Sequence, residues 1–104
     1  MTEERHALIN KLFNHTLGEE TIINLPIFIN LAKNVKIGKN VIIMNGFQCM
    51  SAGGLVIEDD ARISLNCTIA TNNHVFYDRD VLTCKSIHIK KNAWLGVNVT
   101  IFFV

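Results

Sequence analysis

One stretch of the chain, TNNHVFYDRDVLTC at residues 71–84, gathers side chains that can do chemistry. It contains His74, and an imidazole titrates near neutral pH, so it can take a proton from a substrate and return it later. Tyr77, Asp78 and Arg79 follow closely and could contact an acceptor or a phosphate, or be solvated. Taken by itself, the stretch favours a surface loop whose histidine has no role.

The three cysteines offer a second kind of reactive group, but they form no known motif. Cys49, Cys67 and Cys84 have no CxxC spacing, and none of them adjoins a histidine. This spacing argues against a disulfide framework, a zinc knuckle and a thiol nucleophile. A sparse, odd set of thiols is typical of a reducing compartment, so we expect a cytoplasmic protein.

Composition limits the kinds of partner that the chain can have. The 104 residues are 49% hydrophobic and carry a formal net charge of +1. This charge balance predicts neither a nucleic-acid surface nor attraction to a membrane surface. No stretch reaches the roughly 18 apolar residues of a membrane span. The amino end, MTEERHALINKL, lacks the apolar run of a signal peptide.

Outside this stretch the chain follows a period of six residues. Apolar residues recur at that spacing in three runs: Leu25, Leu31, Ile37, Ile43 and Cys49; Ile57, Ile63 and Ile69; Ile89, Leu95 and Ile101. Three places after most of them stand residues that tolerate the left-handed backbone of tight turns, namely Asn34, Asn40, Gly46, Asp60, Asn66, Asn72, Asn92 and Asn98. A helix has a period of about 3.6, so this pattern excludes one. It predicts a parallel β-helix of short strands whose periodic apolar residues point inward.

The remaining segments must cap and interrupt that β-helix. Residues 2–17 are predicted to form a helix ended by Gly18, with an apolar face made of Leu8, Ile9, Leu12 and Phe13. We assign residues 1–18 to an N-terminal helix that covers the first coil and residues 19–104 to the β-helix domain. Residues 71–86 form an inserted loop in that domain. Such a loop can lean on a neighbouring chain and make a cleft that a regular wall does not offer.

Four segments of the chain, NVKIGKNVIIMNG, GGLVIEDDARIS, TNNHVFYDRDVL and IHIKKNAWLGVNVTI, resemble the hexapeptide-repeat acyltransferases. Within that family they are most similar to the maltose and galactoside O-acetyltransferases. The resemblance extends from about Glu4 to Ile101, and the block from Thr71 to Gly96 is its most specific part. It implies an all-β solenoid, a left-handed parallel β-helix that usually assembles as a homotrimer with active sites between subunits.

The resemblance also implies a reaction. Such proteins transfer an acetyl group from acetyl-CoA, a co-substrate, to a hydroxyl of a sugar or similar acceptor, with no tightly bound cofactor and no metal. By position, His74 matches the catalytic histidine and would act as the general base. Trp94 either packs on the wall or lines the site, and with Gly96 it is expected to contact acetyl-CoA. The candidate acceptor contacts are Asn45, Tyr77, Asp78, Arg79 and Trp94.

Two departures from the family pattern leave other functions open. Met44 stands where the family carries an asparagine, with Asn45 one place off. Relatives continue past the position of Ile101 with coils that line the acetyl-CoA groove, so we expect a shortened chain. The alternative function is an inactive or truncated β-helix that acts as a structural or binding module. A zinc enzyme is less favoured, because zinc needs three protein ligands and only His88 of a neighbour could assist His74.

Overall fold

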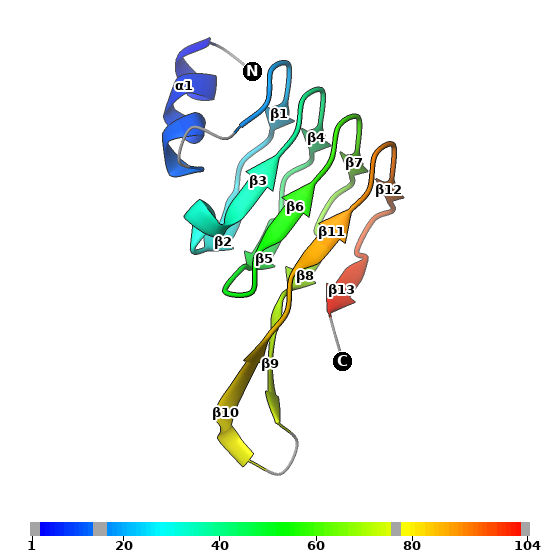
Figure 1. Ribbon diagram of the computed structural model, residues 1–104. Coiled ribbons are helices and arrows are strands. Elements are labelled where there is room, and N and C mark those ends of the chain that lie inside the picture. Colours follow the sequence, from blue (N-terminus) through cyan, green and yellow to red (C-terminus); the bar gives the residue numbers. More distant parts are fainter. Residues whose placement is uncertain (1–2, 14–16, 76–77, 103–104) are drawn as a thin grey trace.

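The chain folds as a left-handed parallel β-helix with three walls, capped at one end by a helix (Figure 1). The computed structural model describes residues 3–13, 17–75 and 78–102, with the backbone alone for residues 73–75 and 78–83. Within these ranges, no helix is long and apolar enough to cross a membrane. The parallel sheets confirm the β-helix that the period of six predicted.

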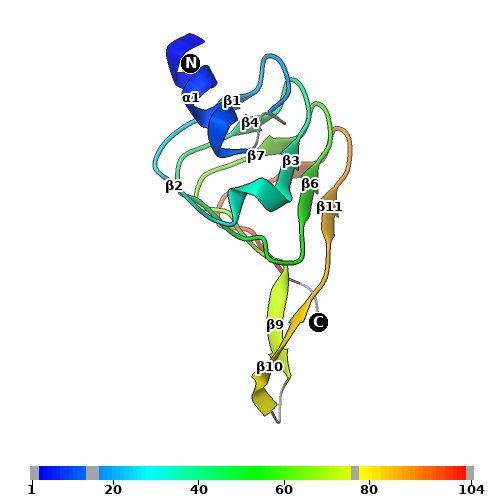
Figure 2. The same cartoon turned by 60° about the vertical axis from the view of Figure 1, so that its left-hand side comes forward.

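Each wall is a parallel sheet that takes one strand from every coil. The first wall contains β1 (Ile22–Ile23), β4 (Ile42–Ile43), β7 (Arg62–Ile63) and β12 (Trp94–Leu95). The second wall contains β2 (Ile27–Asn30), β5 (Phe47–Met50), β8 (Thr68–Ala70) and β13 (Thr100–Phe102). The third wall contains β3 (Val35–Ile37), β6 (Leu55–Ile57) and β11 (Ile87–Ile89). Figure 2 shows the three walls as the sides of a triangle.

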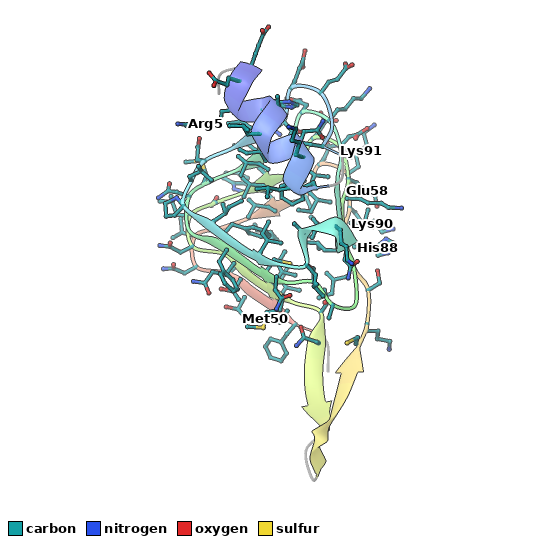
Figure 3. The ribbon with its side chains drawn as sticks, turned by 90° about the vertical axis from the view of Figure 1, so that its left-hand side faces the viewer. Arg5, Met50, Glu58, His88, Lys90 and Lys91 are labelled. Atoms are coloured by element: carbon teal, nitrogen blue, oxygen red, sulfur yellow. The ribbon has the colours of Figure 1, made fainter. Side chains whose placement is uncertain are left out.

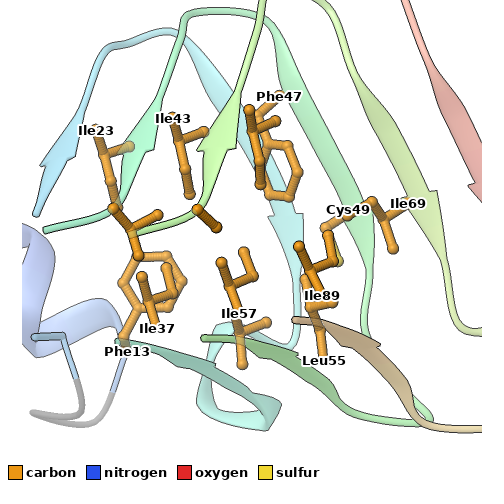
Figure 4. Packing of buried hydrophobic residues seen from close by; sticks show 14 of the residues in the cluster. Phe13, Ile23, Ile37, Ile43, Phe47, Cys49, Leu55, Ile57, Ile69 and Ile89 are labelled. Carbon is orange, nitrogen blue, oxygen red and sulfur yellow. The ribbon is translucent and has the colours of Figure 1, made fainter. Parts of the chain in front are cut away.

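The interior is a continuous apolar column. Alternate residues of the wall strands are buried, as in β3, β5 and β6, because successive side chains of a strand point to opposite faces. The periodic residues Ile37, Ile43, Cys49, Ile57, Ile63, Ile69 and Ile89 all lie in this core, as predicted. In Figure 4 six of these side chains, all except Ile63, are labelled and fill the space between the walls together with Phe13 and Phe47.

The predicted phase of the repeat is wrong in the first coil. Leu25 and Leu31 were expected in the core, yet their side chains are 51% and 45% exposed. The inward positions are instead Leu17 and Ile23, which are buried. The cause is an extra turn, η1 (Ala32–Asn34), where the chain turns from the second wall into the third. Leu31 precedes that turn with a left-handed φ of 58°. Because a leucine and not a glycine takes this conformation, the sequence does not mark the change in the phase of the repeat.

The tight turns between strands use the residues that the pattern predicted. Positive φ angles occur at Asn40, Gly46, Asp60, Asn66, Asn92 and Asn98, whereas Asn34 belongs to η1 and Asn72 to a strand. Glu20 and Leu31 also take positive φ angles, which the sequence did not indicate. The turn side chains stack from coil to coil, as where Asn40 Nδ2 donates to Asp60 Oδ1 at 2.8 Å.

The helix α1 spans Glu3–Leu12, and the predicted end of the helix at residue 17 is wrong. Leu17 already pairs with Ile37 in an isolated parallel bridge, so the chain has joined the third wall by that point. Ile9 and Phe13 lie one helical turn apart and are buried against the first coil. Leu8 and Leu12 are both 60% exposed, so the predicted apolar face is only half buried.

Candidate functional site

The segment predicted as an inserted loop is an antiparallel hairpin. Its strands are β9 (Asn72–Val75) and β10 (Asp78–Cys84), and it projects away from the triangle of walls (Figure 2). It leaves the coil at the corner between the second and third walls. The two earlier coils carry only short turns at this corner, closed by hydrogen bonds from Asn34 N to Leu31 O and from Gly54 N to Ser51 O, both 2.9 Å long.

The backbone of His74 is held in this hairpin and pairs with Leu82 on the opposite strand. The ladder has a register shift between Asp78 and Leu82, and Arg79 lies in that irregular part. Tyr77 lies outside the described residues. The candidate base therefore sits on a paired strand, close to the coil, and the predicted contacts Asp78 and Arg79 lie farther out along the hairpin.

Trp94 lies elsewhere, on the outer surface of the first wall. Its side chain is 79% exposed, and its indole Nε1 donates to Ser64 Oγ at 3.3 Å. On the neighbouring strand its register partner is Arg62. These residues border a shallow groove of about 350 Å³ that is lined by Ile42, Met44, Arg62, Ile63, Ser64, Leu65, Trp94 and Val97. The groove is mainly apolar, with a hydroxyl and a guanidinium at its edge.

Two other predicted residues, Gly96 and Asn45, adjoin in the chain residues that line this groove. Gly96 follows Trp94 by two places, and a side chain built there would meet no atom within 4 Å. The carbonyl of Gly96 accepts a hydrogen bond from Cys67 Sγ at 3.1 Å. Asn45 is exposed in the turn next to Met44, and its carbonyl accepts a hydrogen bond from Asn66 N at 3.2 Å. Asn45, Trp94 and Gly96 thus belong to one side of the molecule.

His74 and Trp94 are not brought together within one chain. The hairpin leaves the corner between the second and third walls, whereas Trp94 lies on the first wall, across the triangle (Figure 2). After the hairpin the chain first forms β11 in the third wall and only then reaches β12, which carries Trp94. His74 and Trp94 are therefore separated by a whole wall. A site that uses both residues therefore needs the hairpin of one chain next to the first wall of another.

The departure at Met44 has a structural counterpart. Its sulfur lies 3.8 Å from Asn24 Nδ2 and accepts a weak hydrogen bond from that amide. Asn24 stands 20 residues earlier, in the same position of the previous coil. An amide is therefore present beside the groove, one coil away from the position where the family pattern would put it.

The remaining reactive side chains lie where the sequence predicted. Cys49 and Cys67 are buried and Cys84 is exposed. Burial raises the pKa of the Cys49 thiol to about 12, although a hydrogen bond with Ser51 acts in the opposite direction. His88 is exposed on the outer face of β11, close to Glu58 and Lys90 (Figure 3). Within the described ranges, no group of three His, Cys, Asp or Glu side chains could hold a metal ion.

Both regions also depend on residues that were not predicted as site residues. Ser64 and Arg62 border the groove at Trp94, and both flank the inward residue Ile63. Thr71 and Gly53 hold the base of the hairpin. The signal for Thr71 was available, because Ser51 and Thr71 are both small hydroxyl residues at the end of a strand of the second wall.

Two curated proteins are similar to this chain in sequence. The chain is 25% identical over 103 residues to the galactoside O-acetyltransferase of Escherichia coli (strain K12), covering 95% of this chain and 50% of that protein. It is 35% identical over 104 residues to a provisionally assigned acetyltransferase of Staphylococcus aureus (strain Mu50), covering 96% and 52%. The chain thus spans about half the length of the curated relatives it matches. No protein-family profile matches it.

Solved structures agree with these relatives. A hexapeptide-repeat acetyltransferase of Vibrio cholerae superposes with a TM-score of 0.89 at 28% identity, covering 95% of this chain and 58% of that one. The structure of a V. cholerae hexapeptide-repeat acetyltransferase in complex with acetyl-CoA superposes with a TM-score of 0.76 at 21% identity, covering 93% and 61%. The second likeness concerns the fold alone.

Proposed function

Because the chain belongs to the hexapeptide-repeat acyltransferases, we propose that it moves an acetyl group from acetyl-CoA to a hydroxyl of a sugar or similar acceptor. The observation that carries the proposal is the hairpin: an otherwise regular β-helix departs from its walls at one corner, and the departing segment holds His74. Acetyl-CoA is the co-substrate in this proposal, because the sequence is similar to acetyltransferases. We expect the protein to work in the cytoplasm.

In this reaction the imidazole of His74 accepts the proton of the acceptor hydroxyl, whose oxygen attacks the thioester carbonyl. A carbon–oxygen bond forms and the carbon–sulfur bond breaks. The proton then passes from His74 to the departing thiolate, so that acetylated acceptor and free CoA leave. A general base of this kind contributes about 10²- to 10⁴-fold to the rate. Pairing of the His74 backbone with Leu82 supports this role, because it ties the base to a two-stranded ladder.

A covalent acetyl-enzyme is not part of the proposal. A thiol attacks as its thiolate, and the raised pKa of about 12 keeps Cys49 protonated near neutral pH. Cys67 is likewise buried, with its Sγ donating to the Gly96 carbonyl. Direct attack by the acceptor needs only the base and the thioester.

We further propose that the working site lies between copies of the chain, with a homotrimer as the assembly. Support comes from the positions of the two halves of the site, since one chain places the hairpin and Trp94 on different sides of the triangle. In the proposed complex the groove beside Trp94 takes the acyl end of acetyl-CoA, along its apolar lining of Met44, Leu65 and Val97. The open space at Gly96 admits the co-substrate close to the backbone.

The acceptor lies between the groove and the hairpin in this proposal. Asn45 on the groove side and Asp78 and Arg79 on the hairpin side are proposed to contact it, and Tyr77 is a further candidate from the sequence. Asn24 joins them as a candidate, because its amide lies beside Met44 at the groove. The acceptor class rests on the likeness to the galactoside O-acetyltransferase.

The proposal is tested by thiol release. Purified protein is incubated with acetyl-CoA and a panel of maltose, methyl galactoside and methyl glucoside, and free CoA is followed over time. We expect acceptor-dependent release that falls by about 10²- to 10⁴-fold in His74→Ala. Absence of release from a folded wild-type sample would overturn the proposal and favour a structural or binding module.

A further inference from the structure

The hairpin is fixed to the coil before it by a buried threonine. Thr71 is 0% exposed, and its Oγ1 donates to the carbonyl of Met50 at 2.7 Å. The same Oγ1 accepts a hydrogen bond from Gly53 N at 2.9 Å. Both partners belong to the second coil, so one hydroxyl ties the start of the hairpin to the corner beneath it.

Gly53 leaves room for both legs of the hairpin. A Cβ at this position would lie 2.5 Å from Lys85 N, 2.7 Å from Lys85 O and 2.8 Å from Thr71 O. These are backbone atoms, which cannot turn aside as a flexible side chain can. Lys85 N in turn donates to Thr71 O at 2.8 Å and closes the base. Gly53 is therefore needed for close approach, and the outgoing and returning strands both lie against it.

The corner one coil earlier lacks this arrangement. Ser51 donates its hydroxyl to the carbonyls of Asn30 and Leu31 and accepts no described backbone N–H. Thr71 adds the bond from Gly53 N at the corner where the hairpin departs. Asn72, the first residue of β9, follows at once, and His74 lies three residues beyond Thr71. A change in direction at Thr71 is therefore carried directly to the strand that holds His74.

We propose that Thr71 is a positioning residue that sets, with Gly53, the direction in which the hairpin leaves the wall, and so the place of His74. This inference rests on the proposed function, in which His74 is the base. Displacement of a base by about 1 Å can cost on the order of 100-fold in rate. The two hydrogen bonds of one hydroxyl thus contribute to turnover from a site that never touches substrate.

The test compares Thr71→Val with a matched control elsewhere in the same wall system. Thr21 is 1% exposed, donates to Gly38 O at 2.6 Å and accepts from Val41 N at 3.1 Å, so it makes the same pair of bonds far from the hairpin. We expect Thr71→Val to lower kcat by about 10- to 100-fold. Thr71→Ser, which keeps the hydroxyl, should restore most of that loss. Thr21→Val should lower Tm about as much as Thr71→Val does. It should leave kcat within about twofold, because the hydrogen bonds of Thr21 do not reach the hairpin.

A second readout keeps the inference testable without turnover. Hydrogen–deuterium exchange of the β9 and β10 amides should rise in Thr71→Val and in Gly53→Ala, and stay unchanged in Thr21→Val and Thr71→Ser. If the wild type releases no CoA, the proposed function fails while the exchange data still decide whether Thr71 fixes the hairpin. Equal hairpin exchange in Thr71→Val and Thr21→Val would overturn the positioning role, as would a loss of kcat that Thr71→Ser does not restore. If Thr71→Val does not fold, Gly53→Ala carries the same comparison.

Discussion

The second and third coils turn from the second wall into the third in two different ways. The second coil uses the short turn at residues 51–54, closed by Gly54 N donating to Ser51 O at 2.9 Å. The third coil instead runs out through β9 and back through β10, and the carbonyl of Thr71 accepts a hydrogen bond from Lys85 N at 2.8 Å, one register position before the donor of the second coil. The flanking strands keep their register, with Cys49 opposite Ile69 and Ile57 opposite Ile89.

This difference indicates where a β-helix can gain a new element. Coils are joined by the backbone hydrogen bonds of their strands and by the inward apolar column, and neither depends on the length of a corner. The core at Ile57 and Ile89 is buried whether the preceding corner is short or long. A corner can therefore carry a functional segment while the walls continue above and below it.

The strongest way to break the comparison is to give the third coil the corner of the second. Residues 72–86 are replaced by Ala-Gly-Gly, the sequence found at residues 52–54. Because the two corners are equivalent, we expect the shortened chain to keep its β-sheet circular dichroism and a cooperative thermal transition. If the proposed function holds, acetyl transfer should fall by at least about 10²- to 10⁴-fold, because His74, the proposed base, is removed. A chain that no longer folds would show that the hairpin is part of the wall and that the corners are not equivalent.

The thiols give a second comparison between wall and hairpin. Cys84 is exposed in β10, whereas Cys49 is buried in the second wall with its pKa raised to about 12. Since the thiolate is the reactive form and Cys49 is buried, a disulfide reagent at pH 8 should modify Cys84 much faster than Cys49. The fast phase should disappear in Cys84→Ser. Three thiols reacting at one rate would show that the walls open as readily as the hairpin.

The same pKa sets a pH dependence whose sign is fixed by the direction of the shift. Burial disfavours the ionised thiol, so the folded state binds the proton of Cys49 more tightly than the unfolded state does. The contribution of Cys49 to stability is therefore full below its ordinary value of 9.0 and is lost as the pH rises toward about 12. In denaturant titrations, Cys49→Ala should show a smaller fall in the free energy of unfolding across that range. Equal falls in the free energy of unfolding would mean that the Cys49 thiol ionises as easily in the folded state as in the unfolded state.

Much of the wall structure could be predicted from the sequence, because each strand contributes its inward residues at a fixed spacing. Ile37, Ile43, Ile57 and Ile63 were assigned to the core on that basis and are buried. The prediction failed at Leu31, where a bulky residue takes a left-handed backbone that sequence rules reserve for Gly, Asn and Asp. Inward positions are counted from one coil to the next. The unrecognised turn at Leu31 therefore also made the assignment of Leu25 to the core wrong.

The site was harder to predict, because its parts come from different walls. His74 was identified through its resemblance to a family, whereas its place on a paired strand depends on contacts between β9 and β10 that no local motif indicates. Trp94 lies 20 residues after His74, which is the length of a regular coil and would suggest that the two lie in one column. The hairpin occupies most of that interval, so Trp94 lies on another wall.

The smallest expected effect concerns the corner that misled the prediction. Leu31 and Asn66 have the same φ of 58°, and both side chains are exposed. A left-handed backbone costs most L-residues roughly 1–2 kcal/mol, and asparagine less. We therefore expect Leu31→Asn to raise the free energy of unfolding by about 1 kcal/mol and Asn66→Leu to lower it by a similar amount, as measured by urea titration. If Leu31→Asn is instead destabilising, the half-exposed leucine packs usefully at its corner. The left-handed backbone at Leu31 would then be stabilised by packing of its side chain and would not be a strain that the fold tolerates.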